Sequence, residues 1–389
     1  MMLFFRITTS MLLLIGLAAC QGGGTTITDT SATTLSTAHS WSWSLPPNFP
    51  TPPVPADNAM SEDKFQLGRN LFYDKRLSGN GSYACESCHN QNKAFTDGKA
   101  LSVGSTGQTL NRNAPSLINS AYHATYTWVN PTLTNLETQM ATPLFATEIV
   151  EMGVDDSNKS IILQRFKDVP AYIQLFKSAF PDETDPINFD NIIKAIAAFE
   201  RGLLTGNSKY ELYQKSQATL TDAEERGRVL FNGEKAECFH CHGSFNFNDQ
   251  VNFLGKRAEE NLFHNTGLYN IGGNGTFPLN NQGLIKFSGK TSDMGLFRAQ
   301  SLWNVGVTAP YMHDGSIATL EEVLDFYSAG GRNITSGLYQ GDGRLNPYKS
   351  GLVGLISLTE QEKADIVAFL KTLTDESMLT NERFSNPFK

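Results

Sequence analysis

Two stretches of the chain place apolar side chains every three or four residues, the spacing of a helix with one buried face. The first is NIIKAIAAFERGLL (191–204) and the second is TEQEKADIVAFLKTL (359–373), which starts with a capping box formed by Thr359 and Glu362. The apolar positions are Ile192, Ile196 and Phe199 in the first stretch, and Ile366, Phe369, Leu370 and Leu373 in the second. An amphipathic helix is therefore expected near the end of each half of the chain.

Two more capping boxes predict helices in the second half. Thr221 and Glu224 begin one of them, and Thr319 and Glu322 begin the other. The first carries Arg228, Leu230 and Phe231, and the second carries Leu320, Val323, Leu324 and Tyr327 on one face. Strand signals are sparse and the glycine-rich segment 265–295 reads as loop. The expected fold class is mostly α.

One pattern occurs twice. GRNLFYDKRLSGNGSYACESCH (68–89) and GRVLFNGEKAECFHCH (227–242) share G-R-x-L-F, a linker and C-x-x-C-H. Two copies of one supersecondary unit predict two related domains joined by long loops. We place the first domain at residues 58–205 and the second at residues 206–389.

The N-terminus has a different character. Arg6 is the only charge before Cys20, and the apolar run MLLLIGLAAC ends in small residues. This layout predicts a secretory signal peptide at residues 1–19. Leu-Ala-Ala-Cys resembles a bacterial lipobox, which would make Cys20 a lipid anchor. A plain signal peptide with an incidental Cys20 is the alternative. Residues 20–57 read as a flexible tether and an extended arm.

Composition narrows the class of protein. The 389 residues are 40% hydrophobic and 18% charged, which is ordinary for a globular protein. The net charge of −8 becomes −9 when Arg6 is removed, and it argues against nucleic acid as a partner. Export predicts the periplasmic side of the cell envelope, an oxidising compartment.

Both C-x-x-C-H runs read as c-type haem attachment sites. Cys85 and Cys88, like Cys238 and Cys241, are spaced to form thioethers, and the next residue, His89 or His242, offers an imidazole to iron. Four ligands within CFHCH cannot wrap one zinc ion without strain. A joint four-cysteine zinc site leaves both histidines unexplained, and the βαβ context of a thioredoxin is missing. His240 is not expected to be a ligand. The architecture predicted is two cytochrome c-type domains, each with one covalent haem.

The chain resembles the bacterial di-haem cytochrome c peroxidase superfamily, in its MauG/MbnH-like branch, from about residue 60 to residue 375. The stretches that carry the resemblance are LGRNLFYDKRLSGNGSYACESCH, RNAPSLINSAY, LETQMATPLFATEIVEMG, ECFHCHGSFNF and APYMHDGSIATLEEVLDFY. The resemblance implies that the haem at His89 meets hydrogen peroxide and that the haem at His242 relays electrons. Trp128 matches the aromatic residue between the haems, although it could be a packed core indole.

The resemblance also implies a distal glutamate that moves the peroxide proton, with a glutamine and a proline beside it. Gln139 and Pro143 match the latter pair. Glu151 is the expected glutamate, and Glu148 is the alternative because two extra residues follow Pro143. Either carboxylate could instead lie on the surface.

Two departures favour the MauG-like branch. Segment 90–116 lacks the histidine that blocks the resting peroxide haem in many relatives, so that haem is expected to be five-coordinate. His123 is expected to be structural. Tyr327 stands where donor-dependent peroxidases have a methionine ligand, and a phenolate oxygen favours ferric iron. A core tyrosine is the alternative, with Met294 or Met312 as the ligand.

A structural calcium ion is implied by the same resemblance. Its ligands would be Asn113 and the carbonyl oxygens of Thr308 and Pro310, and oxygen donors suit calcium. His313 is expected in the haem surroundings.

The expected function is a peroxide-dependent di-haem oxidoreductase that oxidises an envelope partner protein by long-range electron transfer. One alternative is a detoxifying peroxidase fed by a small cytochrome. Another is a non-enzymatic electron-transfer lipoprotein.

Overall fold

The computed structural model describes residues 39–46, 48–256, 262–354 and 356–389. The expected signal peptide, the lipid anchor at Cys20 and much of the tether lie outside these residues. Within them, no helix has both the length and the apolar character needed to cross a membrane. Residues 37–389 form one compact unit.

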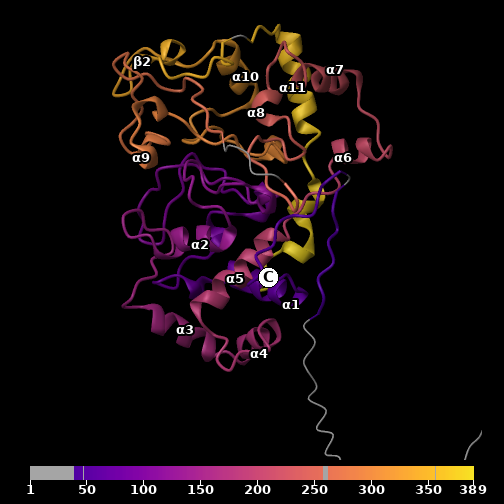
Figure 1. Cartoon of the computed structure of the whole chain (residues 1–389), viewed down its shortest axis with the longest axis vertical. Helices are drawn as coiled ribbons and strands as arrows, with labels where there is room; N and C mark the ends of the chain where they lie inside the picture. The colour runs from indigo at the N-terminus through magenta and orange to yellow at the C-terminus, as the bar shows by residue number, and fades with distance from the viewer. Residues whose placement is uncertain (1–38, 47, 257–261, 355) are drawn as a thin grey trace, which may run out of the picture. The chain divides into compact units, whose positions relative to one another are not determined.

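The described chain is mostly helical, as predicted, and its strands are two residues long (Figure 1). The α-helices are α1 (Glu62–Tyr73), α2 (Leu136–Phe145), α3 (Lys159–Lys167), α4 (Pro170–Ala179), α5 (Phe189–Arg201), α6 (Lys209–Gln214), α7 (Asp222–Phe231), α8 (Phe239–His242), α9 (Ile285–Ser288), α10 (Leu320–Ser328), α11 (Glu360–Lys371) and α12 (Glu376–Thr380). Single 3₁₀ turns are η1 (Lys75–Leu77), η2 (Cys85–Ser87), η3 (Gln91–Lys93), η4 (Ser120–Tyr122), η5 (Thr291–Asp293), η6 (Val305–Val307), η7 (Gly343–Leu345) and η8 (Glu382–Phe384). Strands β1 (Asn333–Ile334) and β2 (Gly341–Asp342) pair antiparallel.

Helices α1 and α5 form the centre of the first half. Ser61 caps α1, and its side chain accepts a hydrogen bond from the Lys64 amide. Gly68 faces α5 so closely that a Cβ atom would lie 1.9 Å from the Ala195 carbonyl oxygen. The apolar face predicted for α5 is buried, and its Phe199 packs against Phe65 with ring centroids 5.3 Å apart.

Helices α7 and α11 repeat this arrangement in the second half. Both begin at the predicted capping boxes, in which a threonine and a glutamate bond each other's backbone. A Cβ atom on Gly227 would lie 1.9 Å from the Asp365 carbonyl oxygen. Arg226 crosses the same contact and donates to the Asp365 carboxylate at 2.8 Å. The repeated sequence pattern is therefore a repeated helix pair.

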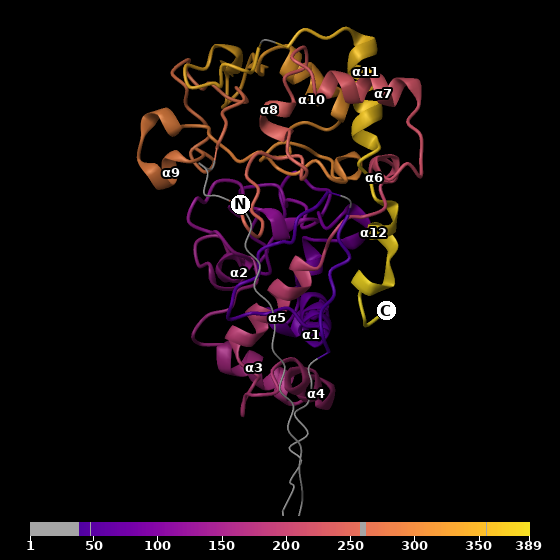
Figure 2. The same cartoon turned by 45° about the vertical axis from the view of Figure 1, so that its right-hand side comes forward.

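The C-terminal tail returns to the first helix pair, which the sequence pattern did not predict. Met378 and Phe384 are part of the same buried cluster as α1 and α5. The Tyr73 hydroxyl donates to the Phe384 carbonyl at 2.7 Å, and Arg69 Nε donates to the Ser385 carbonyl at 2.6 Å. Figure 2 shows the yellow tail running from α11 through α12 toward α1.

The N-terminal arm is held on the body by aromatic contacts. Trp41 lies 5.3 Å from Phe65 between ring centroids and packs edge-on against Trp43. Further along, Phe49 packs against Tyr122 and Phe245. The arm therefore contacts both halves of the compact unit.

The helix contact at Gly227 can be tested by adding a single methyl group. On an exposed helix, glycine to alanine stabilises by about 1 kcal/mol. Here the Cβ atom would meet the Asp365 backbone, so Gly227→Ala should lower the free energy of unfolding by about 1–3 kcal/mol. Denaturant unfolding of the haem-loaded protein measures the change. Gly351→Ala is the control because nothing lies within 4 Å of its Cβ position; equal effects of the two variants would contradict this account.

Candidate functional site

The first C-x-x-C-H motif sits at the end of a turn that follows α1. Cys85 starts η2, and the His89 amide donates to the Cys85 carbonyl at 3.0 Å. The His89 ring Nδ1 donates to the Phe95 carbonyl at 2.8 Å, where Phe95 has a left-handed backbone with φ of 59°. This bond leaves Nε2 as the nitrogen available to a metal.

The second motif is built in the same way. It forms the short helix α8, and the His242 ring Nδ1 donates to the Phe247 carbonyl at 2.7 Å. Phe247 is also left-handed, with φ of 50°. Burial lowers the pKa of both His89 and His242, which favours the neutral imidazole that binds metals.

A large cavity surrounds His242. It holds about 1770 Å³ of space free of atoms, including solvent at its mouth. Cys238, Cys241 and His242 line it from one motif, and Tyr327 lines it from α10. Met312 also reaches this cavity, whereas Met294 packs nearby in the cluster that includes Tyr327. The structure thus brings the predicted tyrosine and its methionine alternatives to one region.

Several residues that line this cavity have a buried side-chain nitrogen without a hydrogen-bond partner. Among the described residues, Arg298 Nη1, Gln300 Nε2 and His313 Nε2 have no hydrogen-bond partner. Arg298 is anchored through Nε, which donates to the Thr127 carbonyl at 3.0 Å. Burial lowers the pKa of Arg298 to about 10, so it stays charged at neutral pH. A buried guanidinium and a buried amide, each with an unpaired N–H donor, call for an anionic or carbonyl acceptor.

The two glutamates considered as the proton carrier, Glu148 and Glu151, both lie in the first half of the chain. The Met152 amide donates to the Pro143 carbonyl at 3.0 Å, which folds the segment carrying Glu151 back against α2. Gln139 lies one helical turn before Pro143. Burial raises the pKa of Glu151 to about 7. Burial is also the main cause that raises the pKa of Cys85 and Cys88, and the Glu151 charge adds a smaller effect on both thiols. Glu148 is exposed. The two candidate glutamates therefore differ in burial, a difference that the sequence did not indicate.

Trp128 lies where the two halves meet. It lines the large cavity, and its Nε1 donates to the Asn113 carbonyl at 2.8 Å. The backbone carbonyl of Trp128 accepts from the Arg298 amide at 2.9 Å. Its indole N–H is thus paired, as a core tryptophan requires, and its ring still borders the cavity.

The three residues expected at a calcium site also line this cavity. Asn113 Nδ2 donates to the Lys99 carbonyl at 2.7 Å, which leaves Oδ1 as the free end of the amide. Within the described ranges, no hydrogen bond is accepted by Asn113 Oδ1 or by the carbonyl oxygens of Thr308 and Pro310. Three unpaired oxygen atoms fit a hard cation.

The other histidines take different roles. His123 is buried, and burial lowers its pKa well below the usual value. His313 lines the cavity and stacks on Phe297 with ring centroids 3.7 Å apart. His240 points to Glu237, with Nε2 2.7 Å from Oε2.

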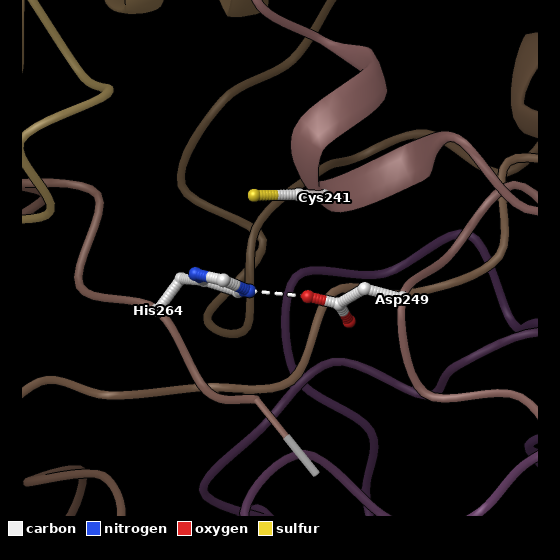
Figure 3. A group of neighbouring side chains, drawn as sticks. All are labelled: Cys241, Asp249 and His264. Atoms are coloured by element: carbon white, nitrogen blue, oxygen red, sulfur yellow. Dashed lines mark hydrogen bonds and ion pairs between the residues drawn. The ribbon is translucent and has the colours of Figure 1, made fainter. Parts of the chain in front are cut away.

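A histidine–aspartate pair next to the second motif was missed in the sequence. Figure 3 shows His264 and Asp249 side by side, with the His264 Nε2 bonded to Asp249 Oδ2 and the thiol of Cys241 close to both side chains. Burial alone would lower the pKa of His264, but its bonds to Asp249 and Cys241 prevail and raise it to about 10. No spacing rule links residues 241, 249 and 264, so only the fold could reveal this group.

Comparison with known proteins gives consistent matches. The model of the di-haem cytochrome c peroxidase family matches residues 62–219. Methylamine utilization protein MauG of Methylorubrum extorquens is 31% identical over 361 residues, covering 92% of this chain and 90% of that protein. Cytochrome-c peroxidase IdrP1 of Denitromonas iodatirespirans is 34% identical over 348 residues, covering 85% of this chain and 87% of that protein.

Two solved structures also resemble this chain. The crystal structure of a MauG-like protein associated with microbial copper homeostasis is 55% identical, with a TM-score of 0.89, and the match covers 90% of this chain and 100% of that one. The di-haem peroxidase BthA from Burkholderia thailandensis shares the fold at a TM-score of 0.63 and 20% identity, covering 84% of this chain and 90% of that one.

These likenesses define a class, the peroxide-dependent di-haem oxidoreductases with two c-type haems. The chain belongs to the di-haem cytochrome c peroxidase family that includes MauG. The predicted family, the mostly helical fold and the use of peroxide are thereby confirmed.

The residues around the second motif fit a haem. Two thiols and a histidine with Nε2 available line one cavity, and apolar side chains such as Leu324 and Ile366 border it. Arg298 and Gln300 also line this cavity, and a guanidinium and an amide are side chains that can donate to carboxylates such as the two that a haem carries.

Burial of Glu151 makes stability depend on pH. Its pKa rises from 4.5 to about 7, so the folded chain holds this proton more tightly than the unfolded chain. The resulting stabilisation is complete below pH 4.5 and is lost as the pH rises through about 7. Glu151→Gln should therefore gain stability relative to the wild type across this window, by up to about 3 kcal/mol. Denaturant midpoints measured at several pH values test this. Glu148→Gln should show no such trend, and a Glu151→Gln difference that is constant with pH would contradict the expectation.

Proposed function

We propose that this protein uses hydrogen peroxide to oxidise a tryptophan side chain on a partner protein in the cell envelope. The observation that carries this proposal is Tyr327, a phenol buried in the cavity of His242. If a haem is bound at His242, a phenolate ligand from Tyr327 would favour ferric and higher-valent iron, which suits an oxidant more than a simple electron carrier. The 55% identical MauG-like structure supports the same reading and makes a partner involved in copper homeostasis the first to test.

In this proposal each motif holds one haem. Cys85 and Cys88 would attach the first through thioethers, and His89 Nε2 would bind its iron. Cys238, Cys241 and His242 would do the same for the second. When bound, the haems supply the electron-transfer chemistry and the site at which peroxide is reduced. The hydrogen bonds from the two ring Nδ1 atoms to Phe95 and Phe247 hold each imidazole in one orientation.

Glu151 is the proposed proton carrier. A general acid–base group works best when its pKa lies near the working pH, and burial raises the pKa of this carboxyl group to about 7. It takes the proton from the near oxygen of peroxide and returns it to the leaving oxygen. Gln139 and Pro143 lie on the helix against which the Glu151 segment folds, and they would stand beside Glu151 in this role.

Trp128 is the proposed link between the two haem sites, because it borders the cavity from the first half of the chain. Asn113 and the carbonyls of Thr308 and Pro310 would hold a calcium ion close by, and the unpaired oxygen atoms described above support this. The open coordination at His89 is supported by the absence of histidine from segment 90–116.

The domain boundaries and the cellular location are also part of the proposal. We retain a signal peptide at 1–19, a tether at 20–57 and domains at 58–205 and 206–389. The mature protein would act on the periplasmic side of the envelope, anchored by lipid at Cys20. The runner-up function is a detoxifying peroxidase that takes electrons from a small cytochrome, as the match to cytochrome-c peroxidase IdrP1 supports.

The tyrosine ligand gives a spectroscopic prediction. Tyr327→Phe should change the optical and electron paramagnetic resonance spectra of the second haem and raise its reduction potential, since the anionic ligand is lost. Tyr311→Phe is a matched control, because its hydroxyl lines the same cavity but donates to the Val305 carbonyl at 2.9 Å. An unchanged spectrum in Tyr327→Phe would exclude phenolate ligation and turn attention to Met312.

Addition of one equivalent of peroxide to the fully ferric protein, without a reductant, tests the function itself. The MauG-type reading expects rapid loss of the ferric spectrum at both haems. Glu151→Gln should slow this step by about 10²–10⁴-fold, whereas Glu148→Gln should not. A protein that reacts only after half-reduction would instead be the detoxifying peroxidase, and an unaltered rate in Glu151→Gln would refute the proton-transfer assignment.

A further inference from the structure

One chain of oxidisable rings leads from the cavity of His242 to the protein surface. Trp303 lines the cavity and is 2% exposed, with its Nε1 donating to the Phe245 carbonyl at 3.2 Å. Its ring centroid lies 6.4 Å from that of Tyr210, and Tyr210 lies 6.2 Å from Tyr213 in a stacked arrangement. Tyr210 and Tyr213 are one turn apart on α6, and both are half-buried.

The other tryptophan and tyrosine rings that line the cavity do not contact any further tryptophan or tyrosine ring that the structure describes. Within the described ranges, Trp128 has its ring contact with His313, and Tyr327 has its ring contact with Phe326. Tyr311 makes no ring contact within these ranges. The rings of Phe247 and Phe369 also touch Tyr210, but a phenylalanine ring does not lose an electron at potentials that oxidise indole or phenol.

We infer that Trp303, Tyr210 and Tyr213 form an electron relay through which an external donor delivers electrons to the second haem site. The inference rests on the proposed function and adds the route by which oxidation leaves the cavity. Contacts of about 6 Å between successive centroids let each electron move in short steps. The partner would therefore be oxidised at the surface next to α6.

The relay balances electrons and protons. Peroxide takes up two electrons and two protons and gives two waters. For each electron, Tyr213 passes one inward through Tyr210 and Trp303 and releases its phenolic proton to solvent, which leaves a neutral tyrosyl radical. The donor then returns one electron, and solvent returns the proton. Without a donor, the radical at Tyr213 should persist long enough to be trapped.

Spin trapping tests the relay without a partner. The haem-loaded protein is treated with peroxide and a nitroso spin trap, and the labelled residue is identified by peptide mass spectrometry. The wild type should be labelled at Tyr213. Tyr210→Phe keeps the ring volume but interrupts the relay, so the label at Tyr213 should be lost while peroxide is still consumed. Trp303→Phe should lose the label as well.

Tyr339→Phe provides the control. Tyr339 is 39% exposed and lies 5.6 Å from Tyr269, but neither ring lines the cavity. This variant should keep the Tyr213 label. Equal labelling of Tyr213 in Tyr210→Phe, or labelling of the wild type at Tyr339 alone, would overturn the relay. Failure of partner oxidation is a separate result, because it would leave Tyr213 labelled and the partner's side chain unchanged.

Discussion

Each haem motif of this protein depends on a contact between a glycine and a helix backbone. Gly68 and Gly227 let α1 and α7 approach the carbonyl oxygens of Ala195 and Asp365, where any side chain would collide. The close approach holds α1 against α5 and α7 against α11, and a C-x-x-C-H run follows α1 and α7 in the chain. Each motif is therefore connected to a tightly packed helix pair.

The two halves share further backbone features in addition to the helix pairs. Asn119 and Asn304 are both left-handed, and their amides donate to the Leu203 and Leu373 carbonyls, just past α5 and α11. The histidine of each motif also bonds a left-handed phenylalanine carbonyl. Two copies of one scaffold thus carry unequal chemistry, because the first places Glu151 near its thiols and the second places Tyr327 in its cavity.

Features set by neighbouring residues could be predicted from the sequence, and features set by distant ones could not. The capping boxes at Thr221, Thr319 and Thr359 formed as expected, since both partners lie within one turn. The pairing of His264 with Asp249 and the return of the C-terminal tail join segments that no period or motif connects. The different burial of Glu148 and Glu151 could not be predicted either, because an irregular loop has no period that indicates which side chain points inward.

Burial raises the pKa of both Glu151 and Tyr327, but the consequence for the proposed role differs between the two residues. A carboxyl group whose pKa is about 7 can hold a proton and give it up near neutral pH, so Glu151 needs no further partner to act as an acid and a base. Burial also raises the pKa of Tyr327, and no cationic side chain in the described part of the chain lowers it. That phenol stays neutral unless a metal ion compensates for its negative charge. Phenolate character at Tyr327 would therefore be direct evidence of an iron bond, which makes its spectrum more informative than its position.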